Sequence, residues 1–280
     1  MMEESPMARL TVAARKANTD RLETASEDTR LVQGVARGLA VLRAFKPGET
    51  SLSNAELAER TGLSKPTVSR LSQTLVALGY LSIVARSGHY QLGAGIVALC
   101  HSLLAGMPHR MAARPVLQEI AEFARVPASL AMRDQLLMLT IETAHHPQMR
   151  PARFDLGSRL PIESTAMGRA YLFALAENER EALLRRVQLQ WSRSEWRGVR
   201  AGIDVAFKSL AKRGFCLSLG DRLPDVYAAG APVVTHDGTV LAINCGGMPS
   251  EVTAEQLENE IGPRLAHAAK QISVEIPSGA

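Results

Sequence analysis

Cysteine is scarce in this sequence, and its few cysteines are not spaced as metal ligands or as disulfide partners. The chain of 280 residues has three, Cys100, Cys216 and Cys245. They form no CxxC or Cys/His ligand pattern, and their number is odd, so the sequence argues against a disulfide framework and a structural zinc site. This usage fits a protein of the reducing cytoplasm.

Long apolar runs are also missing. No stretch approaches the roughly 18 consecutive apolar residues of a membrane span, and the N-terminus lacks the apolar core of a signal peptide. We therefore expect a soluble, cytoplasmic protein without a membrane partner. Since 46% of the residues are apolar, a chain of this length has enough material for two buried cores.

Residues typical of catalysis or metal binding form no recognisable constellation. His145 and His146 are adjacent, and adjacent strand residues point to opposite faces, so we expect them in a loop before Pro147 and not on one ion. Cys245 has no local motif that would supply an activating base, and we interpret it as a small buried apolar residue. The sequence thus predicts no metal, no cofactor and no enzyme.

Positive charge, in contrast, is concentrated in one segment. Residues 31 to 95 hold seven Lys/Arg and three Asp/Glu, a net charge of +4, whereas residues 96 to 280 hold 20 and 19, a net charge of +1. This distribution is typical of one module that meets a polyphosphate, although an ordinary solvated surface is the alternative. Residues 1 to 30 have few large apolar residues and are expected to be a flexible tail.

The basic segment begins with two predicted helices. "VQGVARGLAVLRAF" is amphipathic and is closed by Pro47 and Gly48. Its predicted inward stripe comprises Val32, Val35, Leu39, Leu42 and Phe45. "SNAELAERTG" opens with a capping box of Ser53 and Glu56 and ends at Gly62.

A third helix follows in "SKPTVSRLSQTLVALG". Ser64 is its predicted N-cap, and Pro66 is tolerated in a first turn. Val68, Leu71, Leu75 and Leu78 form the predicted apolar stripe. A nucleotide-binding loop is excluded because no strand precedes the turn and the GxxxxGK[ST] spacing is absent.

The other side of this third helix is polar in a way that favours DNA recognition. Short donors and acceptors with two cations lie away from the stripe, at Ser64, Lys65, Thr67, Ser69, Arg70 and Gln73. Together with the preceding helix they predict a helix-turn-helix whose recognition helix enters the major groove. "YLSIVARSGHYQLG" then predicts a hairpin about Ser87-Gly88, the wing, with Arg86 and His89 at its tip for phosphate or the minor groove; a plain solvated loop is the alternative.

Several motifs in order make the resemblance to a family specific. "VARGLAVLRAF", "LSNAELAERTGLSKPTVSRLSQTLVALGYL" and "GHYQLGAGIVAL" resemble the winged helix-turn-helix of the IclR family of bacterial transcription regulators. "GSRLPIESTAMGRAYLFA" resembles the effector-domain motif of that family, and "APVVTHDGTVLAINCGGMPS" its terminal strand pair. The resemblance covers residues 31 to 275.

The pattern of the second half agrees with this resemblance. Strands are predicted in "ASLAMR", "LLMLTIET", "FCLSL", "YAAGAPVV" and "VLAINC", and helices at 165 to 176, 178 to 190 and 202 to 213. Thr253 and Gln256 predict a capping box before a terminal helix. Trp191 and Trp196 are expected in a loop, where they cover an effector or pack against a partner subunit.

The expected fold class is α+β, a winged helix-turn-helix joined by a linker helix to a GAF-like α/β effector-binding domain. The expected boundaries are a tail at 1–30, the DNA-binding domain at 31–93, the linker helix at 94–108, the effector-binding domain at 109–275 and a C-terminal tail at 276–280.

The resemblance also implies where a small effector binds. Ser164 and Thr165 precede a helix whose first backbone donors favour a carboxylate. Carried over by motif, the lining residues are Ala166, Met167, Ala228, Cys245 and Gly247. Cys245 and Gly247 stand where the family often has serine, and Asp225 where it usually has glycine, which favours an aromatic or more apolar acid. Arg133, Arg153 and Arg159 are candidate carboxylate partners; surface or structural ion pairs are the alternative.

The sequence therefore predicts a transcription regulator that binds operator DNA and a small effector. By resemblance it should form dimers, which the effector domains pair into tetramers, and effector binding should change operator affinity or contacts with RNA polymerase. Two rivals are an adaptor that keeps the fold without DNA binding, and an enzyme whose helical N-terminus serves as a dimerisation arm.

Overall fold

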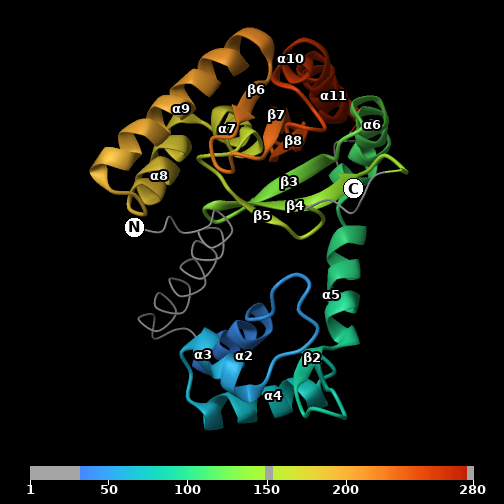
Figure 1. Cartoon of the computed structure of the whole chain (residues 1–280), viewed down its shortest axis with the longest axis vertical. Coiled ribbons are helices and arrows are strands. Elements are labelled where there is room, and N and C mark those ends of the chain that lie inside the picture. Colours follow the sequence, from blue (N-terminus) through green and yellow to red (C-terminus); the bar gives the residue numbers. More distant parts are fainter. Residues whose placement is uncertain (1–31, 149–153, 276–280) are drawn as a thin grey trace. The chain divides into compact units, whose positions relative to one another are not determined.

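The computed structural model describes residues 32–148 and 154–275, and Figure 1 shows their helices and strands. The tails predicted at 1–30 and 276–280 lie outside these ranges, as does Arg153. Within the described ranges no helix is long and apolar enough to cross a membrane.

The first compact unit of the chain ends at Gly106 and contains a winged helix-turn-helix. Its elements are α2 (Gln33–Arg43), α3 (Asn54–Thr61), α4 (Lys65–Ala77), β1 (Leu81–Ile83), β2 (Tyr90–Leu92) and α5 (Ala94–Ala105). The two strands pair antiparallel, as predicted for the wing. The core of this unit is formed by Val41, Ala44, Leu52, Leu57, Val68, Leu81 and Tyr90.

Local capping fixes the start of α3 and the turn between α3 and α4. The Ser53 hydroxyl accepts a hydrogen bond from the Glu56 amide at 3.2 Å, and the Glu56 carboxylate accepts one from the Ser53 amide at 2.8 Å. Gly62 ends α3 at φ 69°, a left-handed conformation that glycine adopts without strain. Ser64 then caps α4 by accepting from the Thr67 amide. The predicted capping box and both helix boundaries at this turn are confirmed.

The apolar stripe predicted on the first helix is wrong in part. Val32, Val35 and Leu39 are 69%, 61% and 45% exposed. The buried residues of α2 are Ala40 and Val41, because the helix packs on its neighbours through a face almost half a turn away. The spacing of apolar residues identifies an apolar face of a helix. It does not tell whether the rest of the same chain packs against that face. Leu78, placed on the stripe of α4, is likewise exposed.

The second unit begins at Met107 and is built on one antiparallel sheet. Its six strands lie in the order β5-β4-β3-β8-β7-β6. Their bounds are β3 (Ala128–Asp134), β4 (Leu137–Ala144), β5 (Arg159–Pro161), β6 (Cys216–Leu219), β7 (Tyr227–Val234) and β8 (Val240–Gly247). The strands predicted from alternation are confirmed, and the short β5 was missed.

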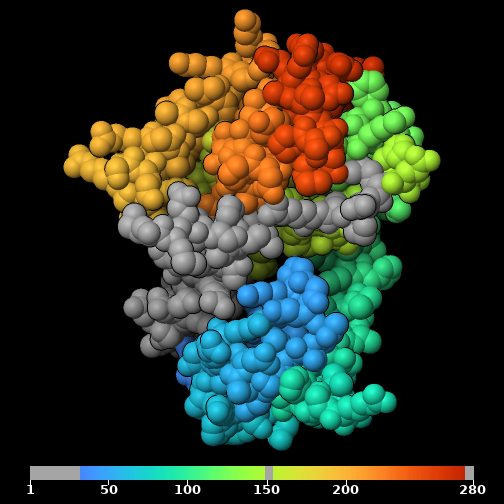
Figure 2. Space-filling view, in the orientation of Figure 1, coloured from blue at the N-terminus to red at the C-terminus, as the bar shows by residue number. Residues whose placement is uncertain are grey.

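Helices cover both faces of this sheet (Figure 1). On one face lie α6 (Pro108–Ala124) and α11 (Gly262–Glu275), whose side chains share a core with Leu130, Ala229 and Ile243. On the other face lie α7 (Ala166–Ala174), α8 (Glu177–Gln188) and α9 (Arg193–Arg213), which pack with Met138, Ala228 and Ala242. Figure 2 shows α8 and α9, coloured yellow to orange, at the outer surface of this unit.

The loop predicted around the two tryptophans is wrong for Trp196. Helix α9 starts at Arg193 and not near residue 202, because Ser192 and Glu195 form a capping box. Trp196 therefore lies in the first turn of α9, and Trp191 lies just before it; both are partly buried against the α7 side of the sheet. The S-x-x-E pattern in the sequence was the signal for this helix start.

The terminal helix is confirmed. Thr253 and Gln256 form the predicted capping box at the start of α10 (Ala254–Gln256). The chain continues through a π-helical turn, η1 (Leu257–Ile261), into α11. An added Cβ on Gly262 would lie 2.2 Å from Cε2 of Phe215, so glycine allows this helix to approach the core closely.

Candidate nucleic-acid interface and effector site

The solvent side of α4 carries the side chains predicted to read DNA. Lys65, Arg70 and Gln73 are exposed, and Thr67 and Ser69 are half-buried. The side of α4 that bears Arg70 is opposite the buried Val68. Ser64 caps the helix and its hydroxyl lies 2.8 Å from that of Thr67, so its hydrogen bonds serve the start of α4.

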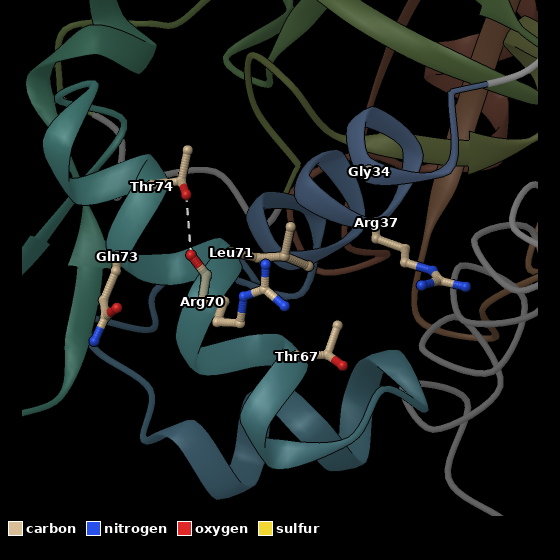
Figure 3. Close-up of a pocket in the computed structure, with 7 residues that line it drawn as sticks. All are labelled: Gly34, Arg37, Thr67, Arg70, Leu71, Gln73 and Thr74. Carbon is tan, nitrogen blue, oxygen red and sulfur yellow. Dashed lines mark hydrogen bonds between the residues drawn. The ribbon is translucent and has the colours of Figure 1, made fainter.

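A hollow of about 490 Å³ lies beside the recognition face of α4, and Figure 3 shows its lining. It is lined by Gly34 and Arg37 of α2 and by Thr67, Arg70, Leu71, Gln73 and Thr74 of α4. No acidic residue lines it. Arg37 and Gly34 were not among the residues singled out from the sequence, because their helix carries no recognition pattern of its own.

The wing turn connects β1 to β2 through a tight hydrogen-bonded loop. The Val84 amide donates to the His89 carbonyl at 2.8 Å, and Gly88 adopts φ 70°. Arg86 is exposed in this turn, whereas His89 is half-buried. The predicted tip position is therefore met by Arg86 more fully than by His89.

In the second unit, α7 crosses the sheet at very short range. Thr165 is its N-cap and accepts a hydrogen bond from the Gly168 amide at 3.2 Å. An added Cβ on Gly230 would lie 2.4 Å from the Ala166 carbonyl carbon, so only glycine fits where β7 passes under the helix start. The backbone N–H groups of Ala166 and Met167 lie in the first turn of α7, where the helix itself offers them no acceptor.

The five predicted effector residues do not share one face of the sheet. Ala166, Met167 and Ala228 lie on the α7 side. Cys245 is buried on the α6 and α11 side, and an added Cβ on Gly247 would lie 2.8 Å from Val126, also on that side. Because strand residues alternate, Asn244 and Gly246 face α7, on the same side of β8 as Ala242.

Ser129, Thr143 and Asn244 lie on neighbouring strands and on the α7 side of the sheet, and we call them the α7-facing polar patch. Ser129 pairs in register with both Asn244 and Thr143, and the hydroxyls of Ser129 and Thr143 are 3.2 Å apart. The Asn244 Oδ1 atom is buried and has no hydrogen-bond partner among the described residues. The surrounding wall is apolar, with Ala131 and Ala242 buried on the same side. The patch can accept a polar group in otherwise apolar surroundings.

Two of the arginines considered as carboxylate partners already have partners in the fold. The Arg133 Nε atom donates to the Tyr171 hydroxyl at 3.1 Å, and Nη1 donates to the Gln135 carbonyl at 3.3 Å. Arg159 forms an ion pair with Asp134 at 3.1 Å. The structural interpretation of both is favoured.

Comparison with known proteins identifies the family. The model of the IclR helix-turn-helix domain matches residues 34–82, and that of the bacterial transcriptional regulator IclR C-terminal domain matches residues 101–274. The chain belongs to the IclR family. It is therefore a transcriptional regulator of the IclR type and not an enzyme, and the fold class expected from the sequence is confirmed.

Relatives of this IclR-family chain match it over most of its length. A crystal structure of an IclR family transcriptional regulator from Brucella abortus is 40% identical, with 90% of this chain and 95% of that chain covered and a TM-score of 0.77. The transcriptional regulator TsaQ1/TsaQ2 of Comamonas testosteroni is 29% identical over 253 residues, 89% of this chain and 90% of its own. An IclR homolog from Microbacterium hydrocarbonoxydans, complexed with 4-hydroxybenzoate, shares the fold at 18% identity, with 86% of this chain and 97% of that chain covered and a TM-score of 0.68.

A buried charge cluster anchors α7 in this IclR-family fold, and sequence reasoning missed it. The guanidinium of Arg169, a residue 5% exposed, bonds to the Glu163 carbonyl at 3.1 Å and to the Asp221 carboxylate. Burial raises the pKa of the Glu163 carboxyl. An added Cβ on Gly202 would lie 2.8 Å from the Arg169 guanidinium, so α9 passes close to it. Arg169 lies within the effector-domain motif, but its partner Asp221 is 52 residues further along the chain, so no local pattern in the sequence indicates the pair.

The cysteines and histidines have structural surroundings. Burial raises the pKa values of the Cys216 and Cys245 thiols to about 12, so both stay protonated near neutral pH. His145 and His146 follow β4 in a loop, as predicted, and His145 lies 3.4 Å from Asp155. In the described ranges, no three His, Cys, Asp or Glu side chains are grouped to hold a metal ion.

Proposed function

We propose that this IclR-type regulator binds operator DNA through α4 and the wing. We also propose that a small organic acid, of the aromatic class, controls this binding. The observation that carries the DNA proposal is the charge on α4. Arg70 and Lys65 are exposed on the recognition side, and neither has an acidic partner among the described residues. Since operator DNA is its proposed partner, we further propose that the protein acts in the cytoplasm.

Arg70 is the first candidate for base reading. Its planar guanidinium can donate two hydrogen bonds to the O6 and N7 atoms of a guanine. Thr67, Ser69 and Gln73 are further readers, while Lys65 and Arg86 contact phosphates. Ser64 positions the helix through its cap, and His89 supports the wing.

The experiment compares wild type and Arg70→Ala on DNA from upstream of the reading frame and on a scrambled duplex, over a range of salt. We expect the substitution to cost roughly 1 to 3 kcal/mol on the operator and little on the scrambled DNA. Unchanged operator affinity at matched salt would remove Arg70 from the readers. Selective binding by neither protein would favour the adaptor alternative.

Self-association is the second part of the proposal. Helix α5 has no buried residue, and Val97, Leu99 and Leu103 are exposed on it, as are Val35 and Leu39 on α2. Such apolar surface is typical of a subunit interface, and a two-fold dimer would bind a pseudo-palindromic operator.

We further propose that effector domains pair dimers into tetramers and that RNA polymerase is a partner. Sedimentation of Leu103→Lys should show a smaller species than wild type; an unchanged species would contradict this interface.

The α7-facing polar patch is the proposed effector site. The start of α7 offers unpaired backbone donors to a carboxylate, and Asn244 offers a buried acceptor to a hydroxyl. Met167 and Ala131 supply apolar contacts for a ring. A fold neighbour that binds 4-hydroxybenzoate supports an acid of this class.

Calorimetric titration with a panel of hydroxybenzoates tests this site. Asn244→Leu should weaken the binding of the best acid at least tenfold, whereas Cys245→Ala, on the other face of the sheet, should keep it. The reverse result would move the site to the α6 and α11 side. Failure of every acid to bind would reject the aromatic class.

A further inference from the structure

We infer that the hollow beside α4 holds a backbone phosphate of bound DNA and that Arg37 of α2 contacts it. This inference rests on the proposed operator binding and extends it to a helix outside the helix-turn-helix pair. Arg37 then positions the recognition helix on the duplex, while Arg70 reads it.

Two guanidinium groups border the hollow from two helices. Figure 3 shows the Arg70 guanidinium reaching from α4 towards α2, and Arg37 extending from α2 on the side away from Arg70; both residues line the hollow. Two like charges beside one hollow repel each other unless an anion lies near them. An anion in the hollow would be attracted by both guanidinium groups.

Neither of these arginines is used to hold the fold together. Among the described residues, the guanidinium groups of Arg37 and Arg70 form no ion pair and no hydrogen bond; the Arg70 carbonyl accepts one from the Thr74 hydroxyl at 3.0 Å. Arg60 of the same unit shows the structural alternative, since its guanidinium bonds to both carboxylate oxygens of Glu49, at 2.5 and 3.0 Å, and to the Ala44 carbonyl. The contrast points to an external partner for Arg37.

Gly34 also points to a group that comes close from outside. Gly34 is the second residue of α2, and glycine in a helix interior costs roughly 0.5 to 1 kcal/mol relative to alanine, an upper bound for the first turn. A Cβ added at Gly34 would meet nothing within 4 Å, and its φ is not positive, so the fold does not require glycine there. Gly34 lines the hollow, and the absence of a side chain keeps that edge open.

The position of the hollow favours a phosphate over a base edge. When a recognition helix lies in the major groove, elements beside it meet the sugar-phosphate backbone that borders the groove. Arg37 is on α2, beside α4, and a guanidinium can bond two phosphate oxygens at once.

The first test measures binding of wild type, Arg37→Gln and Arg43→Gln to operator and scrambled DNA over salt. Arg43 is on the same helix and does not line the hollow, so its variant controls for net charge. We expect Arg37→Gln to lower the affinity for both DNAs about equally, by roughly tenfold. The slope of log affinity against log salt concentration should decrease in magnitude by about 0.9. Arg43→Gln should leave both quantities close to wild type.

The second test fills the hollow without removing a charge. Gly34→Gln should lower the affinity for both DNAs and leave the melting temperature of the protein unchanged or higher. Gly38→Gln should leave the affinity for DNA unchanged. Gly38 is a matched control because a Cβ there also meets nothing within 4 Å and it does not line the hollow.

The outcomes separate this inference from the proposed function. If wild type prefers its operator while Arg37→Gln and Gly34→Gln bind like wild type, the phosphate assignment is overturned and operator binding stands. If Arg37→Gln weakens the operator only, Arg37 is a base reader and the assignment is again overturned. If wild type has no preference for operator DNA, the proposed function fails, and this inference fails with it.

Discussion

The two units of the molecule use arginine in opposite ways. In the second unit several arginines of the sheet and its helices lie next to acids: Arg110 is 2.5 Å from Glu142, and Arg213 is 2.6 Å from Glu258. In the first unit Arg60 has such a partner, Glu49. Lysines and arginines on the α4 and wing surface have none among the described residues, namely Arg37, Lys65, Arg70 and Arg86.

This difference separates charges that serve the fold from charges that serve a ligand. An arginine beside a carboxylate is neutralised within the chain and contributes to packing. A row of cations without carboxylates costs repulsion and has a use only when an external polyanion supplies the negative charge. Net charge in the sequence already located this segment, and the structure shows which of its cations have no acidic partner among the described residues.

The largest expected effect comes from breaking a buried pair in the second unit. Arg169→Met should lower the free energy of unfolding by about 3 kcal/mol, because it leaves the Glu163 carbonyl and the Asp221 carboxylate without their donor. Urea unfolding followed by circular dichroism measures the loss.

The control for this change is Arg200→Met, at an exposed pair with Asp204. It should cost at most about 1 kcal/mol, since exposed ion pairs contribute little. Equal losses at the two arginines would mean that burial does not set the value of these pairs.

A second change gives Arg70 the kind of partner that arginines have in the second unit. Thr74 is exposed and lies four residues after Arg70, so Thr74→Glu places a carboxylate beside the guanidinium. Stability should change by no more than about 0.5 kcal/mol, while operator affinity should fall by roughly 1 to 3 kcal/mol. Thr74→Gln, which has the same shape without the charge, should bind more tightly than Thr74→Glu; equal binding would show that the charge of Arg70 is not what DNA uses.

Sequence patterns predicted most of the elements because their signals are local. The capping boxes at Ser53 and Thr253 and the alternation in β3, β7 and β8 each depend on residues a few positions apart. What the patterns missed depends on contacts between distant residues. The exposed face of α2, for example, follows from which face α4 covers.

The effector residues show the same limit in a sharper form. The start of α7 was located from its motif, but Cys245 and Gly247, carried over as lining residues, lie on the face of β8 that is turned away from α7. A shift of one residue along a strand moves every side chain to the other face. Asn244 and Gly246 could have been chosen by counting in steps of two from Ala242, but the face of Ala242 is fixed only by the packed helices.

The smallest expected effect tests whether the paired arginine of the first unit is structural. The hydrogen bond from Arg60 lowers the pKa of the Glu49 carboxyl below its ordinary value of 4.5. An acid whose pKa is lowered by folding stabilises the protein above its unfolded value, and this contribution is lost as the pH falls through the folded value. Because both side chains are partly exposed, we expect at most about 1 kcal/mol at neutral pH.

Glu49→Gln should therefore be less stable than wild type at pH 7, and the two proteins should converge as the pH falls below 4.5, where wild type also loses the charge. Thermal unfolding from pH 7 to pH 3 measures the difference. Operator affinity at pH 7 should be the same for both, because the Arg60 guanidinium keeps its hydrogen bond to the Ala44 carbonyl and the charge of α4 is unchanged. A variant that unfolds like wild type at pH 7 but binds DNA differently would show that this pair serves DNA binding and not the stability of the fold. The distinction between structural and DNA-binding arginines would then fail.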